Sequence, residues 1–261
     1  MAPSVVQQAG NAGTGTALTV TLGSPTTAGN CLVVFACTVG VSANGTVSGI
    51  TLGGTAGNFA AVASEGTSTD HAIVTCWADP SCAGGQTSVA ISTTGSSGTA
   101  ALTVNAYEVS GMPSVFGSLL DQAAVFSSTG FVTSWTLGPT GTTSQASEIW
   151  FAVVAGNGST GTAGTIAGPG APWTDTALPG ISNWDGSHGL NGVTSYQVVS
   201  SAGTASYNGT ASPSSTLDGL VVTLKAAAVT PPAAAVAPSA AGGAVSGWVM
   251  LPVQGRTGSA G

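Results

Sequence analysis

The chain has 261 residues, with nine Asp or Glu against two Lys or Arg and a formal net charge of −7. The two cations, Lys225 and Arg256, both lie late in the sequence, so residues 1–224 contain neither Lys nor Arg. Because binding to phosphates depends on these side chains, the composition excludes nucleic acid as a partner.

From the N-terminus onward, the composition favours strands over helices. Glycine supplies 40 residues, and the strong helix formers Lys, Glu, Arg, Leu and Met are scarce. Short runs of Thr and Val, separated by Gly-rich segments about every eight to twelve residues, predict an all-β sandwich or barrel. The longest apolar runs, including Cys31–Ala36 and Ile149–Ala155, fall far short of the ~20 residues that cross a bilayer. We therefore expect an all-β protein without a membrane span.

The four cysteines all lie in the first half, at Cys31, Cys37, Cys76 and Cys82. Cys31 and Cys37 are six residues apart on a predicted strand and so share one face, while Cys76 and Cys82 bracket a strand end and a turn. Three disulfide pairings are open, and buried free thiols are at least as good an interpretation. A zinc site is disfavoured, because its paired ligands are normally separated by about two to four residues.

The second half of the chain resembles the first. Each half begins with an alternating strand, turns into an apolar strand, and closes with a further strand. The matching segments are Leu18–Gly23 with Thr133–Gly138, Ala28–Gly40 with Ser147–Gly156, Asn58–Phe59 with Pro172–Trp173, Gln86–Ser92 with Val193–Val199, and Ala101–Val109 with Leu217–Leu224. The repeat predicts two tandem, related antiparallel β-sandwich units, jelly-roll-like, over residues 1–112 and 113–228. Separate sandwiches and two halves of one larger sandwich both remain open.

Three Asn-Gly pairs punctuate the predicted strands. Asn and Gly both tolerate a positive φ, so Asn44-Gly45, Asn157-Gly158 and Asn208-Gly209 predict tight hairpin turns.

No cluster of residues indicates catalysis. His71 and His188 are the only candidates for a general base near neutral pH, and His188 has Asp185 and a serine close by in one loop. A catalytic triad gathers its members from separate segments, so we interpret both histidines as polar loop residues and expect no enzyme. Asp175, Asn183 and Asp185 carry oxygens of the type that calcium prefers, but turn formation is the favoured interpretation, and no metal or cofactor is expected.

The aromatic residues divide into two groups. Trp135, Trp150 and Phe151 lie in apolar strands and are predicted to be core. The other group lies in or beside polar loops of the second half, where rings could stack on a sugar or could close the open end of a sandwich. These candidate glycan contacts are Trp173, Trp184, Tyr196 and Tyr207.

After Lys225 the composition changes to Ala, Pro, Gly and Ser, which predicts an extended linker. A short apolar element follows within the tail 229–261. It consists of Trp248, Val249, Met250 and Leu251. Because an isolated apolar segment on a tether is a liability in a monomer, we expect it to dock on a neighbouring subunit as an added strand or anchor.

Several motifs together resemble one class of β-sandwich domain. They are Thr27–Val34, Gly84–Val89 preceded by a strand with an aromatic residue, Ala106–Gly111 and Asp121. Over about residues 5 to 226 the chain resembles Gly/Ala/Ser/Thr-rich β-sandwich domains of virion proteins of actinobacterial phages and of some secreted bacterial surface proteins. It departs from that pattern at Thr51–Asn58, where an Asp-Ser-Ala-Gly-Asn turn is frequent. The resemblance carries no catalytic residues.

Surface chemistry and resemblance together suggest a role in assembly. A surface of uncharged polar groups is typical of an assembled or extracellular particle, and Met1–Gln8 has neither the basic nor the hydrophobic region of a secretory signal. The resemblance implies a phage virion structural protein, as a minor tail, fibre or capsid decoration component. We expect it to assemble in the host cytoplasm with other virion subunits, to form a homo-oligomer, and to contact a host cell-surface glycan. The alternative is a secreted, extracellular carbohydrate-binding or adhesin module.

Overall fold

The computed structural model describes residues 2–40, 45–66, 71–95, 100–158, 164–182 and 189–228. Residues 1–228 form one compact unit. Nearly all the regular secondary structure of the described residues is β-strand, in antiparallel sheets that pack as sandwiches, which confirms the all-β prediction. Its one helical element is the 3₁₀ turn η1 (Phe116–Ser118), and none of the described residues forms a helix with the length and hydropathy to span a membrane.

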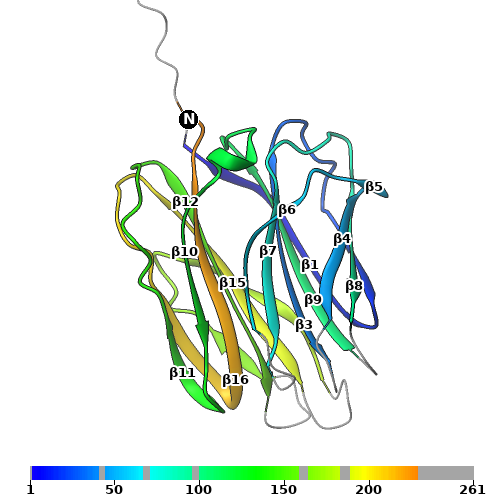
Figure 1. The fold of residues 1–261 in the computed structure, drawn as a ribbon, viewed down its shortest axis with the longest axis vertical. Coiled ribbons are helices and arrows are strands. Elements are labelled where there is room, and N and C mark those ends of the chain that lie inside the picture. The colour runs from blue at the N-terminus through cyan, green and yellow to red at the C-terminus, as the bar shows by residue number, and fades with distance from the viewer. Residues whose placement is uncertain are drawn as a thin grey trace, which may run out of the picture. The chain divides into compact units, whose positions relative to one another are not determined.

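The first half folds into an inner sheet of strand order β1-β9-β3-β7-β6 and an outer sheet of order β2-β8-β4-β5 (Figure 1). The inner strands are β1 (Ser4–Thr14), β3 (Cys31–Gly40), β6 (Ala60–Glu65), β7 (Ile73–Asp79) and β9 (Ala100–Ser110). The outer strands are β2 (Ala17–Thr21), β4 (Thr46–Leu52), β5 (Thr55–Ala56) and β8 (Ser88–Thr94).

The second half has an inner sheet of order β10-β16-β12-β15-β14, and β11 and β13 pair with the first part of β16 on its outer side. The inner strands are β10 (Leu120–Ser127), β12 (Glu148–Gly158), β14 (Thr174–Ile181), β15 (Leu190–Val199) and β16 (Tyr207–Lys225). The remaining strands are β11 (Val132–Leu137) and β13 (Thr165–Ala167).

The strand orders show that the second half repeats the first. Reading across the inner sheets, β1, β9, β3, β7 and β6 correspond to β10, β16, β12, β15 and β14. The 19-residue β16 corresponds to two strands of the first half, β8 and β9. Its first part pairs with β11 and β13, as β8 pairs with β2 and β4. Its second part pairs with β10 and β12, as β9 pairs with β1 and β3. The sequence repeat is therefore a structural repeat.

One of the matched segment pairs is wrong. Gln86–Ser92 leads into β8 of the outer sheet, whereas Val193–Val199 lies in β15, the inner-sheet equivalent of β7. Strands of both sheets are built from the same Ser, Thr and Val residues, so composition alone does not distinguish them. The true counterpart of β8 is the first part of β16.

The hairpin prediction at the Asn-Gly pairs is also wrong where the structure describes them. Asn157 and Gly158 are the last residues of β12, and Asn208 and Gly209 lie within β16, opposite β11. A Cβ on Gly209 would collide with the carbonyl oxygen of Ala167 on β13. Glycine at this position therefore permits close strand approach and makes no turn. Asn44 lies outside the described residues.

Three apolar layers hold the compact unit together. The middle core lies between the two inner sheets and includes Phe35, Tyr107, Ile149, Phe151 and Leu220. The first half has its own core between its two sheets, and the second half has another beneath β11 and β13 that contains the predicted core residues Trp135 and Trp150. The near-continuous apolar runs of β3 and β12 follow from this arrangement, because these strands are buried on both faces.

The two inner sheets pack as a pair of related copies would. β1 packs on β14, and the equivalent strands in the other half, β10 and β6, also pack on each other. β9 contacts β15 as β16 contacts β7. These reciprocal contacts define a pseudo-two-fold relation, the isologous arrangement of a symmetric dimer made within one chain.

All four cysteines are free and buried. Cys31 and Cys37 both face the middle core, as their spacing predicts, and Cys76 joins them there. Burial is the largest cause that raises the pKa of each thiol above its ordinary value, to about 11 for Cys82. These side chains act as small hydrophobic groups of the cores.

Candidate functional site

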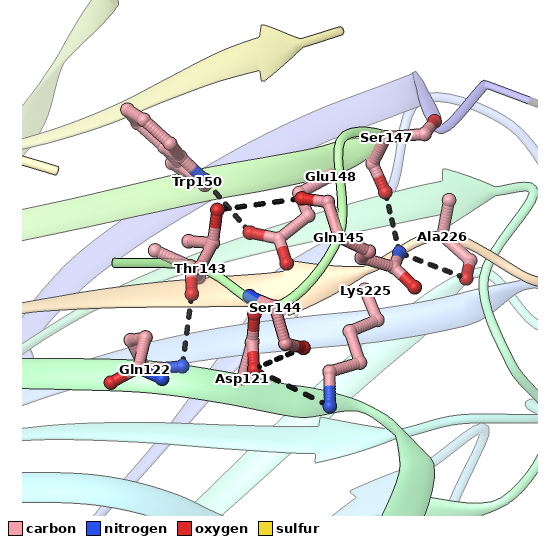
Figure 2. A network of polar contacts seen from close by, with 11 residues as sticks. Asp121, Gln122, Thr143, Ser144, Gln145, Ser147, Glu148, Trp150, Lys225 and Ala226 are labelled. Atoms are coloured by element: carbon pink, nitrogen blue, oxygen red, sulfur yellow. Dashed lines mark hydrogen bonds and ion pairs between the residues drawn. The ribbon is translucent and has the colours of Figure 1, made fainter. Parts of the chain in front are cut away.

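The most unusual polar centre in the described chain joins Asp121, Glu148 and Lys225 (Figure 2). Glu148 begins β12 and stands opposite Lys225, the last residue of β16. Asp121 lies in a β-bulge of β10, where the pairing with β16 shifts between Leu120 and Gln122. Because a bulge redirects a side chain, Asp121 reaches the strand ends on which the other two residues lie.

Asp121 is held as a carboxylate. Its oxygens accept hydrogen bonds from the backbone N–H of Ser144 and, at 2.8 Å, from the Ser144 hydroxyl. Lys225 Nζ lies 3.4 Å from Asp121 Oδ1. Partial burial raises the pKa of Asp121, but the hydrogen bonds from Ser144 and Glu148 and the charge of Lys225 together bring it below its ordinary value. This group is therefore ionised at neutral pH.

The pKa of Glu148 is shifted in the opposite direction. It is 0% exposed, its Oε2 accepts a 2.9 Å hydrogen bond from Trp150 Nε1, and its Oε1 has no donor aimed at it. Burial, followed by the hydrogen bond to Asp121 and the charge on that residue, raises the pKa of Glu148 to about 7. Because the negative charge of Asp121 disfavours a second one nearby, Glu148 keeps its proton to a higher pH than an ordinary glutamate does.

This carboxyl pair is unsuited to glycoside hydrolysis. Hydrolytic carboxyl pairs stand ~5 Å or more apart so that a sugar, or a water, fits between them. Glu148 is 0% exposed, so a sugar has no access to its carboxyl group. The contacts of Asp121 with Lys225 and the pairing of Glu148 with Lys225 instead connect β10, β12 and the end of β16.

The same region anchors the last described residues. Gln145 Nε2 donates to the carbonyl of Ser147 at 2.6 Å and to that of Ala226 at 3.4 Å. The backbone N–H of Ala226 donates to Ser147, and that of Ala227 donates to Gly111. The chain is therefore fixed as far as the point at which the tail 229–261 begins (Figure 2).

A cleft of about 440 Å³ lies beside this anchor. Its lining includes Met112, Pro113, Val115, Gln145 and Lys225, together with Ala226–Ala228. Val115 is 63% exposed, the highest value among the large apolar side chains of the described residues. An exposed apolar wall next to a fixed chain exit is a suitable surface for contact with another subunit.

The buried glutamate of the first half, Glu108, has a different set of hydrogen-bond partners. Glu108 of β9 accepts hydrogen bonds from Gln7 Nε2 at 2.6 Å, Asn30 Nδ2 at 2.6 Å and the backbone N–H of Thr27 at 2.8 Å. Burial raises the pKa of Glu108, but these donors outweigh it and bring the pKa below its ordinary value. Asn30 is the equivalent of Glu148 in the repeat, because β3 pairs with β9 in the same register as β12 pairs with β16.

The structure buries two of the predicted glycan contacts, Trp173 and Tyr207. Trp173 and Tyr207 are 7% and 0% exposed in the core of the second half, with ring centroids 5.0 Å apart. Tyr196 packs instead beside the middle core, against Tyr107 and Phe151. This corrects the expected stacking platform for Trp173 and Tyr207, whose rings close the sandwich. Trp184 lies outside the described residues, and its glycan contact stays a prediction.

The polar side chains of Asp175 and His71 also have partners. Asp175 accepts hydrogen bonds from the Ser195 hydroxyl, the Tyr207 hydroxyl and the backbone N–H of Gly170, and so serves the second-half core. His71 Nδ1 lies 3.0 Å from the buried Asp218 Oδ2, and this contact links the two halves. His71 is therefore more than a polar loop residue.

Several predicted site residues are beyond the structural description, in addition to Trp184. Asn183, Asp185 and His188 lie outside the described residues, and so does the docking element Trp248–Leu251. Their expected roles stay predictions. Within the described ranges, no three His, Cys, Asp or Glu side chains gather as a metal site would require.

The Asp121–Glu148–Lys225 centre was not predicted from the sequence. Its members belong to three separate strands. Only the strand pairing of the repeat could have indicated that Glu148 and Lys225 lie opposite each other. The one available signal was that Lys225 is the sole cation before the tail. Comparisons of the chain with protein-family models, curated proteins and solved structures found no match.

Proposed function

We propose that this chain is a non-enzymatic structural subunit of a bacteriophage virion, as a minor tail, fibre or capsid decoration component. It acts by assembly with other subunits and by adhesion to the host surface. The observation that carries the proposal is the anchored exit of the C-terminal tail. Asp121 pairs with Lys225, Gln145 donates to Ala226, and the Gly111 carbonyl accepts from Ala227, so residues 225–227 are fixed beside an apolar cleft where the tail begins.

The surface composition supports the same proposal. Apart from Lys225 and the two histidines, the chain before its tail has no basic side chain, and its polar surface consists mainly of hydroxyl and amide groups. Such a surface gives little long-range attraction to unrelated polyanions. Contacts between subunits then depend on shape and on the exposed apolar residues, such as Val115 beside the tail exit.

Particle association tests the proposal. We expect the full chain to copurify with virions at a fixed stoichiometry and to appear as repeated density in reconstructed particles. Trp248→Ala and Leu251→Ser in the full chain are expected to reduce incorporation at least about tenfold, because they remove apolar anchor contacts. Val198→Ala, which changes an exposed apolar residue elsewhere, is the control. A chain absent from particles, or one that turns over a substrate alone in solution, contradicts the proposal.

A further inference from the structure

The first half contains a cavity of about 280 Å³ where β4, β5 and the end of β7 meet the following loop. Polar and apolar side chains both contribute to its wall. They include Leu52, Thr55, Asn58, Asp79, Ser81 and Gln86.

Asp79 is the charged group of this cavity and is only 2% exposed. Its Oδ1 accepts the backbone N–H of Ser81 at 3.1 Å, and its Oδ2 accepts that of Asn58 at 3.2 Å. These two bonds fix the plane of the carboxylate and leave each oxygen able to accept another hydrogen bond. Among the described cations, Lys225 pairs with Asp121 and His71 with Asp218, so neither neutralises Asp79.

The rest of the wall distinguishes between classes of ligand. Asn58 and Gln86 carry amides, and Thr55 and Ser81 carry hydroxyls, so the cavity offers donors as well as acceptors. A metal cation could take Asp79 and the amide and hydroxyl oxygens as ligands, but it accepts no hydrogen bond, so it would leave the Asn58 amide N–H without an acceptor. An anion would be repelled by Asp79. A sugar hydroxyl both donates and accepts, and the C–H face of a sugar ring suits the apolar wall at Leu52.

We propose that this cavity binds a neutral saccharide, with Asp79 accepting hydrogen bonds from the hydroxyls of one sugar ring. The inference deepens the host-surface adhesion within the proposed function, and it rests on that function for the source of the ligand. It concerns the first half alone. In the second half, Gln197 takes the place of Asp79, and Pro172 takes the place of Asn58.

Two variants test the cavity directly. Asp79→Asn keeps the shape of the side chain and removes the charge, which should weaken binding about tenfold or more, since a hydrogen bond to a charged group is lost. Ala83→Phe adds a ring at an exposed position on the cavity wall, should abolish binding, and leaves the core untouched. Ala123→Phe adds the same ring to an exposed position of β10 in the other half and serves as the matched control.

The measurement is the change in backbone amide resonances of the ¹⁵N-labelled full chain on titration with glucose, galactose, mannose, N-acetylglucosamine, arabinose and rhamnose. We expect at least one sugar to give saturable shifts at Asn58 and Ser81, lost in Ala83→Phe and retained in Ala123→Phe. Absence of shifts with every sugar overturns the proposal. Saturable shifts at these amides with methylguanidinium chloride and none with sugars also overturn it, in favour of a cation site.

Particle incorporation separates this inference from the proposed function. Ala83→Phe is expected to enter virions at the level of the unchanged chain, because the cavity is remote in the sequence from the tail. If the chain enters particles but binds no sugar, the saccharide site fails and the assembly role stands. If it binds a sugar but never enters particles, the assembly role fails and the site stands.

Discussion

The two halves of the molecule share one strand order yet give their buried glutamates opposite properties. Glu108 in the first half has three hydrogen-bond donors and a lowered pKa, whereas Glu148 in the second half has one donor, a neighbouring carboxylate and a pKa raised to about 7. Both side chains are 0% exposed. The comparison teaches that the number of donors, and not burial alone, sets the charge of an acid in this fold.

The edges of the two sandwiches differ as well. Asn11 of β1 donates to the carbonyl of Thr19 on β2 at 2.7 Å, which closes the first sandwich on that side. The pairing of β1 with β9 shifts between Val5 and Gln7, as that of β10 with β16 shifts at Asp121. Counted from these two bulges, Asn11 corresponds to Phe126, which has no side-chain amide to donate. Phe126 lines an open cleft of about 720 Å³ between β10 and β11. The first half thus has a hydrogen bond across this edge where the second half has an open cleft.

The largest expected effect comes from the middle core, which the two halves share. Phe151→Ala removes a fully buried ring whose centroid lies 5.7 Å from that of Phe35 and 5.1 Å from that of Tyr107. We expect the free energy of unfolding to fall by about 4 kcal/mol. Urea denaturation followed by tryptophan fluorescence should still show one transition, because both halves lose the same core. Two separate transitions in the unchanged chain would contradict a shared core.

The next largest effect is the pH dependence that Glu148 contributes. Its pKa is about 7 in the folded protein against an ordinary value of 4.5, so the folded state binds more protons between these values. The free energy of unfolding should therefore fall as pH rises from about 4.5 to about 7, by up to about 3 kcal/mol. Denaturation midpoints across this range measure it.

Glu148→Gln is the variant that isolates this slope. Glutamine keeps the acceptor for Trp150 and cannot ionise, so the part of the slope that belongs to Glu148 should vanish. Asp218, whose pKa burial also raises, stays in the variant and retains its own contribution of the same sign. A variant with the same pH profile as the unchanged chain would show that Glu148 is not the group responsible.

The repeat and the strand content were predictable from the sequence because they rest on local periodicity. The apolar runs of β3 and β12 identify the buried central strands, and their equivalence survives in the structure. The assignment of β15 failed for a physical reason. Its residues alternate like those of β8, and only the long-range pairing with β12 and β14 places it in the inner sheet.

The same substitution in the two halves sharpens the comparison of the glutamates. In Glu108→Gln the new amide group faces the donors of Gln7, Asn30 and Thr27, so we expect a loss of about 2 kcal/mol at neutral pH. At pH 7 Glu148 is about half protonated and one of its oxygens has no donor, so Glu148→Gln should cost less than about 1 kcal/mol there. Paired urea denaturation curves at pH 7 measure both. Equal losses would remove the distinction drawn between the halves.

The candidate sites were much less predictable than the fold. Trp173 and Tyr207 stand beside polar segments in the sequence, but burial depends on how β11 and β13 cover them, which is a tertiary property. Asp79 gave no signal of its own, since a single acid before a Pro-containing turn is common. Its cavity depends on β5 and the loop after β7 meeting in space.

The smallest expected effect tests the closed edge of the first half. Asn11→Ala removes the bond to the Thr19 carbonyl at an exposed position and should cost about 1 kcal/mol. Hydrogen exchange should quicken in the amides of β2 and leave β11 unchanged, because β11 has no such bridge to lose. Thr19→Ala keeps the carbonyl that accepts the bond and serves as the control, with exchange close to that of the unchanged chain. Equal acceleration in both variants would assign the effect to strand propensity and break the link between Asn11 and the closed edge.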